Sequence, residues 1–246
     1  MVTTARPVRS WVSGLIACLV LLGSATGGSG TAASAAPADR PAIPAPGQSS
    51  LLRRVACPSP ASCWAVGSYT TVSGALVDQI LHWNGRRWSQ FPAPSPGGSS
   101  QLRDVSCISP VACWAIGRFN KPGGPVLNQV LRWDGRRWSL VRTPDPGRTG
   151  AAAEDILGGV ACASTASCWA VGFFAVVSVQ GLVENQVLFW NGRTWFIDVV
   201  PNPAGTASGD NNALHGVRCT SRVSCWAVGS DAPSGQSERN QILHLS

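Results

Sequence analysis

Cysteine is the residue type whose spacing in this chain points most directly to chemistry. Eight of the nine cysteines form four pairs with five residues between partners: Cys57 and Cys63, Cys107 and Cys113, Cys162 and Cys168, Cys219 and Cys225. Zinc sites use shorter spacings and need a second pair nearby, whereas exported chains meet an oxidising compartment. We therefore predict four disulfides, each closed within its own unit, and no metal ion or other cofactor.

Tryptophan is the second residue type with a regular spacing. Seven tryptophans recur at two equivalent positions, which is typical of large side chains packed between neighbouring sheets: Trp64, Trp114, Trp169 and Trp226, with Trp83, Trp133 and Trp190. Three others directly follow expected turns, where an aromatic ring could instead stack on a sugar: Trp88, Trp138 and Trp195. These three are the candidate ligand-stacking residues.

No set of residues suited to catalysis emerges. His82 and His244 hold equivalent positions that other units fill with Arg132 and Phe189, so this position accepts quite different chemistry. The third histidine, His215, matches Arg53, Arg103 and Gly158, again a variable position. Neither a Ser-His-Asp set nor a copper site can be assembled, so we predict no catalytic, cofactor-binding or metal-binding residue. Carboxylates of different loops could still meet at one face: Asp145, Glu154, Asp155, Asp210 and Glu238.

The elements that carry these residues recur at intervals of 50, 55 and 57 residues between first cysteines. A Leu-x-x-Val-x-Cys run ends at the first cysteine of each pair, and a Cys-Trp-Ala-Val-Gly run begins at the second cysteine. In the second unit, Ile116 replaces the Val of the Cys-Trp-Ala-Val-Gly run. The two runs predict a hairpin. A second block then begins at Gln79, Gln129, Gln186 and Gln241, glutamines that we expect to bond to a neighbouring strand's backbone. In three units this block contains Asn84-Gly85, Asp134-Gly135 or Asn191-Gly192, which predict two-residue hairpin turns.

Each unit is thus expected to form a four-stranded antiparallel meander, the pattern of a β-propeller blade. The units span residues 51–98, 102–147, 156–205 and 214–246, and the last lacks the turn and the final strand. Proline-rich segments between units cannot continue a central strand and mark the crossovers. The predicted fold class is an all-β, β-propeller-like array of four repeats.

The paired motifs Cys63-Trp64-Ala65-Val66-Gly67 and Trp83-Asn84-Gly85-Arg86-Arg87-Trp88 carry a resemblance to a known group. The chain resembles the secreted Cys-Trp-Ala-Val-Gly / Trp-Asn-Gly-x-x-Trp repeat proteins of GC-rich Gram-positive bacteria, over residues 51–246. The resemblance implies a propeller-like fold. It implies little about activity, since such proteins are mostly uncharacterised.

The N-terminal residues have the pattern of an export signal. Arg6 and Arg9 precede an apolar stretch too short to span a bilayer, and a small-residue tract follows it. We predict a signal peptide over residues 1–35, a linker or ring-closing segment over 36–50, and a secreted product. The alternative, lipidation at Cys18, is disfavoured because the apolar run continues beyond that cysteine.

The charge distribution and the variable loops limit the classes of binding partner that we expect. The net charge is +7, but the arginines are spread through the repeats with no run longer than two, which disfavours nucleic acid. Loops at residues 68–78, 119–128, 173–184 and 230–240 differ while their flanks repeat, as in a scaffold with a diversified surface. We therefore predict a non-enzymatic module that binds an extracellular protein or glycan through these loops. An extracellular hydrolase or lyase using loop carboxylates and a structural surface protein are the alternatives.

The truncated fourth unit raises the question of how the array closes. Ile43-Pro44-Ala45-Pro46 matches Phe91-Pro92-Ala93-Pro94, which would place residues 39–43 where a blade's final strand lies, beside residues 241–245. Without such a strand the array would be an open arc with exposed edges.

Deletion of residues 37–48 should lower the melting temperature, because it removes the strand expected to close the fourth unit. The measurement is thermal unfolding followed by circular dichroism. An unchanged melting temperature would count against closure by this segment.

Overall fold

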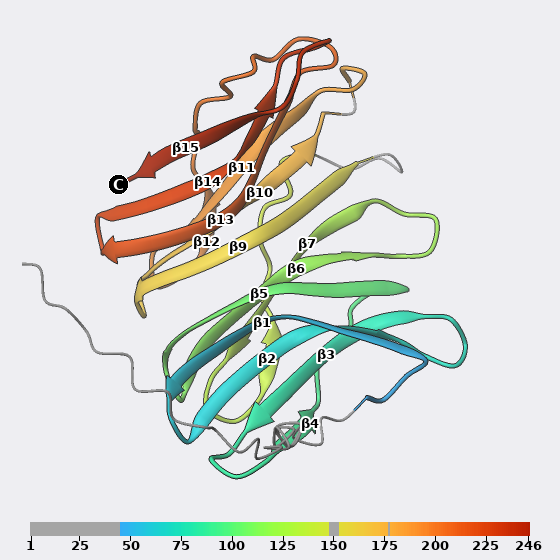
Figure 1. Cartoon of the computed structure of the whole chain (residues 1–246), viewed down its shortest axis with the longest axis vertical. Coiled ribbons are helices and arrows are strands. Elements are labelled where there is room, and N and C mark those ends of the chain that lie inside the picture. Colours follow the sequence, from blue (N-terminus) through green and yellow to red (C-terminus); the bar gives the residue numbers. More distant parts are fainter. Residues whose placement is uncertain (1–44, 148–152, 177) are drawn as a thin grey trace, which may run out of the picture. The chain divides into compact units, whose positions relative to one another are not determined.

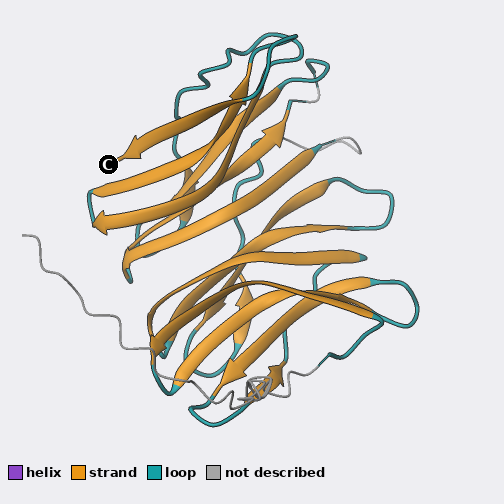
Figure 2. Ribbon diagram, viewed as in Figure 1, coloured by secondary structure: helices purple, strands orange, loops and turns teal. Residues whose placement is uncertain are grey.

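Four antiparallel meanders follow one another along the chain in the computed structural model, which describes residues 45–147, 153–176 and 178–246 (Figure 1). All of these residues belong to one compact unit, Pro41–Ser246, and they form strands and loops only (Figure 2). The predicted signal peptide, Cys18 and the proposed closing strand at residues 39–43 lie outside the described residues.

Each meander is one repeat unit whose strands pair in sequence order, and two parallel pairs join the meanders of units 2, 3 and 4 into one 11-stranded sheet. The first three units form four-stranded meanders, and the described fourth unit has three strands, so the propeller-like fold is confirmed. We call these meanders blades 1 to 4. Blade 1 is β1 (Ser49–Ser59), β2 (Ser62–Thr70), β3 (Leu76–Trp83) and β4 (Trp88–Phe91); blade 2 is β5 (Ser99–Ser109), β6 (Ala112–Asn120), β7 (Val126–Trp133) and β8 (Trp138–Leu140). Blade 3 is β9 (Glu154–Ser164), β10 (Ser167–Ala175), β11 (Val183–Trp190) and β12 (Trp195–Ile197); blade 4 is β13 (Asn211–Ser221), β14 (Ser224–Ala232) and β15 (Arg239–Leu245).

The first strand of each blade lies beside the first strand of the next, so that β1, β5, β9 and β13 form the inner edge of the array. Successive blades are otherwise joined by few backbone bonds. A single parallel pair, Val126 with Glu154, links blades 2 and 3, and another, Val183 with Asn211, links blades 3 and 4. The blades are therefore held together mainly by side chains.

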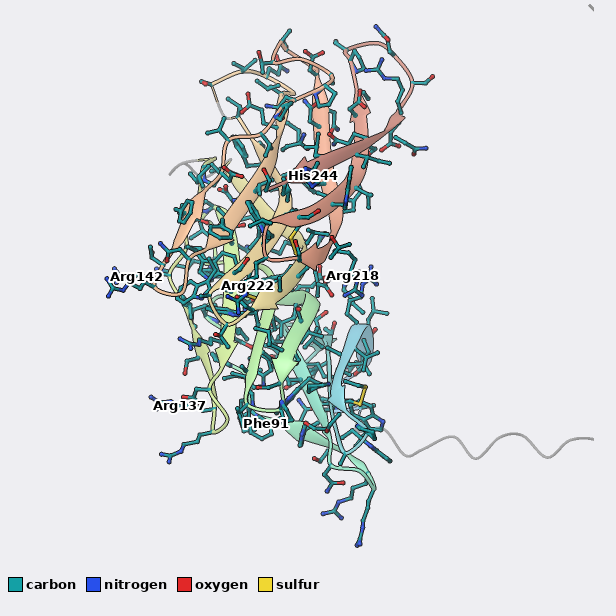
Figure 3. All side chains as sticks on the ribbon, turned by 90° about the vertical axis from the view of Figure 1, so that its left-hand side faces the viewer. Phe91, Arg137, Arg142, Arg218, Arg222 and His244 are labelled. Carbon is teal, nitrogen blue, oxygen red and sulfur yellow. A yellow bond between two sulfur atoms is a disulfide. The ribbon has the colours of Figure 1, made fainter. Side chains whose placement is uncertain are left out.

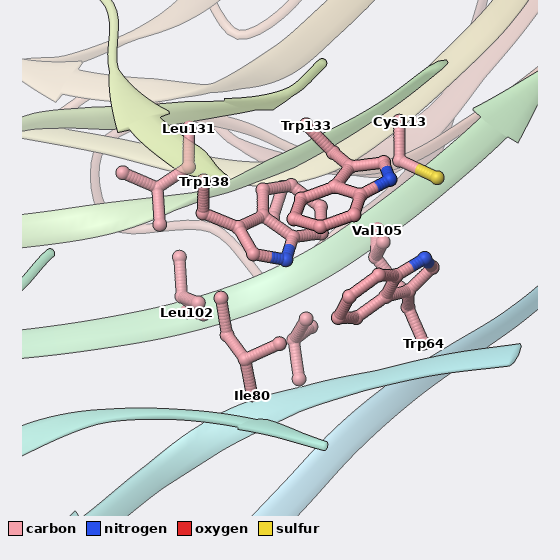
Figure 4. Packing of buried hydrophobic residues seen from close by; sticks show 10 residues of the cluster. Trp64, Ile80, Leu102, Val105, Cys113, Leu131, Trp133 and Trp138 are labelled. Atoms are coloured by element: carbon pink, nitrogen blue, oxygen red, sulfur yellow. The ribbon is translucent and has the colours of Figure 1, made fainter. Parts of the chain in front are cut away.

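A repeated apolar core fills the space between neighbouring blades. Between blades 1 and 2, the buried Trp64 and Ile80 of blade 1 pack with Leu102, Trp133 and Trp138 of blade 2 (Figure 4). The ring centroids of Trp64 and Trp133 lie 4.7 Å apart, and Trp64 meets Trp138 edge-on at 5.3 Å. Equivalent residues form the core between blades 2 and 3, and the core between blades 3 and 4 has Leu245 in the place of Trp133. Five of the seven recurring tryptophans therefore pack between sheets as expected: Trp64, Trp114, Trp133, Trp169 and Trp190. The expectation was wrong for Trp226, which is 48% exposed, and Trp83 is only half-buried.

The variable position held by His82, Arg132, Phe189 and His244 has a common task despite its different residues. Each of these side chains covers the tryptophan that follows the second cysteine of its own unit. His82 lies 4.3 Å from Trp64 between ring centroids, and the guanidinium carbon of Arg132 lies 5.6 Å from the ring centroid of Trp114. A flat or cationic group is enough for this contact, which explains why the position tolerates such different side chains.

The turns that carry Asn-Gly or Asp-Gly differ from the prediction by one position. Asn84 donates its N–H to the carbonyl of Arg87 at 3.3 Å, so the central residues are Gly85 and Arg86 rather than Asn84 and Gly85. Gly85 adopts φ 88°, and the side-chain oxygen of Asn84 accepts the N–H groups of Arg86 and Arg87 at 3.0 and 3.1 Å. The asparagine is therefore needed as an acceptor at the corner, and only the glycine supplies the left-handed backbone.

The proline-rich crossovers are tied to the blades that they leave. The backbone N–H of Asp78 donates to the hydroxyl of Ser95, and that of Asn128 donates to the Asp145 carboxylate at 2.9 Å. Blade 3 repeats the bond with Asn185 and the side-chain oxygen of Asn202. Each crossover is therefore held at a defined place before the next inner strand begins.

The recurring glutamines bond across blades as well as to backbone. Gln241 donates to the carbonyls of Ala213 and Ser230, as expected, and it also exchanges two 3.0 Å hydrogen bonds with the side chain of Asn185 in the preceding blade. Gln129 donates in the same way to Asp78 of blade 1. The other units have asparagine where blade 1 has Asp78, so this unit alone places an ionisable group in the position.

Burial raises the pKa of Asp78 to about 7, although hydrogen bonds from Gln129 and Ser95 partly oppose the shift. The neutral form of Asp78 is therefore favoured in the folded chain. Its contribution to stability is fully present below the pKa of Asp78 in the unfolded chain, 3.8, and is lost as the pH rises from there through about 7. We expect Asp78→Asn, which copies the other units, to change the melting temperature little at pH 4. At pH 8 the substitution should raise the melting temperature by roughly 4–8 °C, which corresponds to a gain of about 2 kcal/mol in the free energy of unfolding.

Asp134→Asn is the matched control, since the equivalent turn residues Asn84 and Asn191 are asparagines. Hydrogen bonds from the N–H groups of Arg137 and Arg136 lower the pKa of the exposed Asp134, so this substitution should not stabilise the protein at pH 8. Calorimetry at the two pH values measures both variants. An Asp78→Asn effect that is the same at pH 4 and pH 8 would contradict the assignment.

Candidate functional site

All four inner strands carry a β-bulge at the same place. In β1, Leu52 pairs with Gly67 and Arg54 pairs with Val66, so Arg53 is the extra residue. The extra residues of β5, β9 and β13 are Arg103, Gly158 and His215. A bulge re-aims the side chain that it carries and is common beside functional sites. The four bulges present Arg, Arg, Gly and His at equivalent points of the inner edge.

The glycine of the Cys-Trp-Ala-Val-Gly motif makes each bulge possible. A Cβ atom at Gly67 would lie 1.9 Å from the carbonyl oxygen of Leu51, and one at Gly117 would lie 2.0 Å from that of Gln101. Gly172 and Gly229 have equally close carbonyls on their inner strands. The motif glycine is therefore required because the bulged inner strand approaches the second strand too closely for any side chain.

The bulge residues converge on one pocket. Arg53, Arg103, Gly158 and His215 line a cavity of about 340 Å³ together with Leu51, Leu52 and Arg54. Each of the four inner strands contributes, so the pocket exists only when the blades are assembled. Its volume is in the range of small-molecule sites. We call this cavity the central pocket.

Positive charge dominates the central pocket. Arg54 lies 3.9 Å from Asp104, whereas Arg53 and Arg103 take part in no ion pair of the described chain. The Nε–H of Arg103 is buried and donates to no hydrogen-bond acceptor among the described residues. Burial lowers the pKa of Arg103, and the neighbouring charges of Arg118 and Arg53 lower it further, whereas the charge of Glu154 acts in the opposite direction. An oxyanion would relieve a half-buried guanidinium that lies beside two like charges.

Asp104 fixes the inner strands around this pocket. Its carboxylate accepts the N–H of Val160 on β9 at 2.9 Å and that of Val105 at 2.8 Å. Burial raises the pKa of Asp104, while these hydrogen bonds and the charges of Arg54 and Arg218 act in the opposite direction. The carboxylate is thus committed to joining blades 2 and 3 and balances Arg54 only in part.

Two of the three candidate stacking tryptophans lie in the core. Trp138 and Trp195 are 4% and 3% exposed and pack against the tryptophans of the preceding blade, so their ring faces are not accessible to a sugar. Trp88 is half-buried, and no blade precedes blade 1 among the described residues. The three residues are therefore not brought together into one binding surface.

The loop carboxylates serve the backbone. Asp145 accepts the N–H of Asn128, and the fully buried Asp155 accepts that of Gly147 at 2.9 Å. Asp210 accepts the N–H groups of Ala207 and Ser234, at 2.8 Å each. These acceptors hold the crossovers and loops in place, and none of the three lines the central pocket.

The eight repeat cysteines lie in pairs at disulfide-bonding distance, each within its own unit. The Sγ–Sγ distances are 2.02–2.09 Å for Cys57–Cys63, Cys107–Cys113, Cys162–Cys168 and Cys219–Cys225. Across the described residues, no group of three or more His, Cys, Asp or Glu side chains is placed to hold a metal ion. No described segment forms a helix of the length and apolarity needed to cross a membrane.

The sequence alone did not identify the central pocket. In the sequence, the variation among His215, Arg53, Arg103 and Gly158 argues against a role for this position, yet it is the position that the bulges turn towards the pocket. One signal in the sequence could have indicated this pocket. The bulge residue varies between units although it lies in a repeated strand, two positions before the Val that all four units share. Such a position is free to differ because it contacts no neighbouring blade core.

Comparison with known proteins adds little to this description. No protein-family model matches the chain, and no curated protein matches it. Among solved structures the chain resembles "YCF48 bound to D1 peptide", with 12% identity and a TM-score of 0.39 over 82% of this chain and 68% of that one. A likeness of this size carries no functional argument, and the propeller-like assignment rests on the blades themselves.

Gly117→Ala should disrupt the bulge that presents Arg103, because the new Cβ would meet the Gln101 carbonyl. We expect a loss of about 1–3 kcal/mol of stability, the usual cost of overpacking. Gly124→Ala is the control, since its Cβ would have ordinary contacts only. Denaturant unfolding of both variants tests the point, and equal stability of the two would contradict the role given to Gly117.

Proposed function

We propose that this protein is a secreted binding module that holds an oxyanion group of an extracellular partner in the central pocket. The single observation that carries the proposal is the half-buried Arg103, whose Nε has no partner and which lies beside Arg53 in a cavity formed by four inner strands. The relationship to the secreted Cys-Trp-Ala-Val-Gly repeat proteins is part of the same proposal.

The chemistry of the pocket favours a carboxylate, sulfate or phosphate group. A guanidinium group offers a planar pair of donors that matches such groups, and partial burial strengthens the attraction by excluding water. The cavity of about 340 Å³ suits one anionic residue of a larger partner. An acidic protein segment and an acidic glycan present the same group, and binding experiments can separate them.

The arrangement also accounts for why the inner strands vary. The apolar blade cores must repeat because each blade packs against an identical neighbour. The bulge residues face the pocket instead, so they can differ without loss of packing, and they can supply two arginines, a histidine and an open space at glycine. A ligand-binding position is expected to behave in this way on a conserved scaffold.

Titration calorimetry with a deca-glutamate peptide and a hexa-galacturonate oligosaccharide tests the proposal, with deca-glutamine and a neutral hexasaccharide as matched ligands. We expect one acidic ligand to bind at low salt and to weaken as the salt concentration rises. Arg103→Gln should reduce the affinity by about tenfold or more, since hydrogen bonds to charged groups contribute about 1.5–3 kcal/mol.

Arg193→Gln is the control, because Arg193 is exposed in the blade 3 turn away from the pocket. Its affinity should stay within about twofold of the wild type. Binding that Arg103→Gln leaves unchanged, or failure of both acidic ligands to bind, would overturn the proposal. Preference for the peptide or for the oligosaccharide identifies the class of partner.

A further inference from the structure

The last blade exposes the side chains that all other blades bury against a neighbour. The motif tryptophan is 1%, 3% and 4% exposed at Trp64, Trp114 and Trp169, but 48% exposed at Trp226. Val228 and Ile242, on the same face of blade 4, are 47% and 64% exposed, whereas their equivalents in blades 1 to 3 are fully buried. We call this surface the blade 4 face.

The first blade exposes the complementary half of the same interface. Val55 is 58% exposed, whereas its equivalents Val105, Val160 and Val217 are 1–6% exposed. Val55 lines a mostly apolar hollow of about 320 Å³ together with Leu52, Ala65, Leu81 and Trp88, and Arg53 and Arg54 complete its lining. The equivalent residues of blade 2, including Leu102, Leu131 and Trp138, are those that receive Trp64 of blade 1. We call this surface the blade 1 face.

The two faces are therefore the two halves of an interface that the chain builds three times. The interfaces between blades 1 and 2 and between blades 2 and 3 join a Trp, Val and Ile surface of one blade to a Leu, Val and Trp surface of the next. The interface between blades 3 and 4 joins Trp169, Val171 and Val187 to a surface of Leu and Val residues without tryptophan. The exposures of Trp226 and Val55 mean that the two faces do not cover each other within one chain, although Arg54 of blade 1 lines the same hollow as Trp226 and Val228. Figure 3 shows the side of the molecule on which His244 lies. The ring centroid of His244 is 4.7 Å from that of Trp226.

We propose that two copies of this chain associate head to tail, with the blade 4 face of each packed on the blade 1 face of the other. Both junctions would repeat the internal interface, and the pair would form a closed ring of eight blades. Propellers of four to eight blades are common, and a head-to-tail contact closes when its rotation completes a ring. This inference goes beyond ligand binding and does not depend on the central pocket being occupied.

A second copy fits these faces better than the segment that precedes β1. Between the predicted cleavage site and Gln48, Ile43 is the only large apolar residue, and there is no tryptophan. Such a segment can add a strand, but it cannot supply the Trp, Val and Ile set that the blade 1 face matches. A second copy presents that set in the required register.

Sedimentation velocity on the protein exported from cells expressing the full chain tests the proposal. We expect the mass of two chains for the wild type. Trp226→Arg and Val55→Arg should each give single chains, with dimer affinity lowered roughly thirtyfold or more, as for central interface residues. Val72→Arg is the matched control, because Val72 is 84% exposed in the β2–β3 loop and lies on neither face. It should remain dimeric.

Mixing the two variants distinguishes head-to-tail contact from other dimers. Trp226→Arg keeps an intact blade 1 face and Val55→Arg keeps an intact blade 4 face, so an equal mixture should regain two-chain species through one intact junction. Circular dichroism of each variant verifies that it is folded.

Several outcomes would overturn the proposal. A wild-type monomer, a dimer that survives Trp226→Arg, or a mixture that stays monomeric would each exclude the head-to-tail contact. Growing polymers would exclude closure by two copies. Dimerisation that appears only after deletion of residues 37–48 would show that this segment covers one of the faces in the intact protein. Because Arg53 and Arg103 are unchanged in these variants, anion binding is measured separately and can fail or succeed independently.

Discussion

The contact between the motif tryptophan of one blade and the apolar face of the next is the interaction on which the rest of the structure depends. Few backbone bonds cross from blade to blade, so the array exists because Trp64, Trp114 and Trp169 are removed from water by the following unit. Burial of a large apolar side chain contributes about 1.5–3 kcal/mol, and each interface gathers many of them. The polar bonds of Gln129 and Gln241 add direction to a contact that is otherwise non-directional.

Within a blade, different devices set the shape of the sheet. The disulfide loops restrict the unfolded chain, each by roughly 2 kcal/mol in an entropic account. They close the hairpin at one end, and the indole N–H of Trp133 adds a 3.0 Å hydrogen bond to the Pro110 carbonyl of the same turn. At the other end the crossovers are held by Ser95, Asp145 and Asn202. A rigid blade can then present its inner strand at a fixed position, which is what a pocket built from four separate strands requires.

Function and assembly use opposite properties of the repeat. The faces between blades must repeat their apolar residues, because each blade packs against a similar neighbour. The bulge residues lie outside these cores, so this position can carry two arginines and a histidine. The same logic explains the ends of the array. A unit whose apolar faces are made to pack against a neighbour leaves one face uncovered at each end of the described array, and Trp226 and Val55 lie on these two faces.

The sequence by itself determined the strands, their grouping into units and the pairing of the cysteines, because these depend on local patterns that recur four times. It also determined the burial of five of the seven repeated tryptophans, and it was wrong for Trp226 because no described blade follows blade 4. It predicted the turn residues but displaced the turn by one position, since asparagine and glycine have separate tasks there. Only the tertiary structure decided that Arg53, Arg103, Gly158 and His215 share one pocket, that Trp138 and Trp195 are inaccessible, and that the end faces remain open. These facts depend on where separate sheets lie in space, and a side chain's neighbours across a blade interface are about 50 residues away in the chain, beyond the reach of any local pattern.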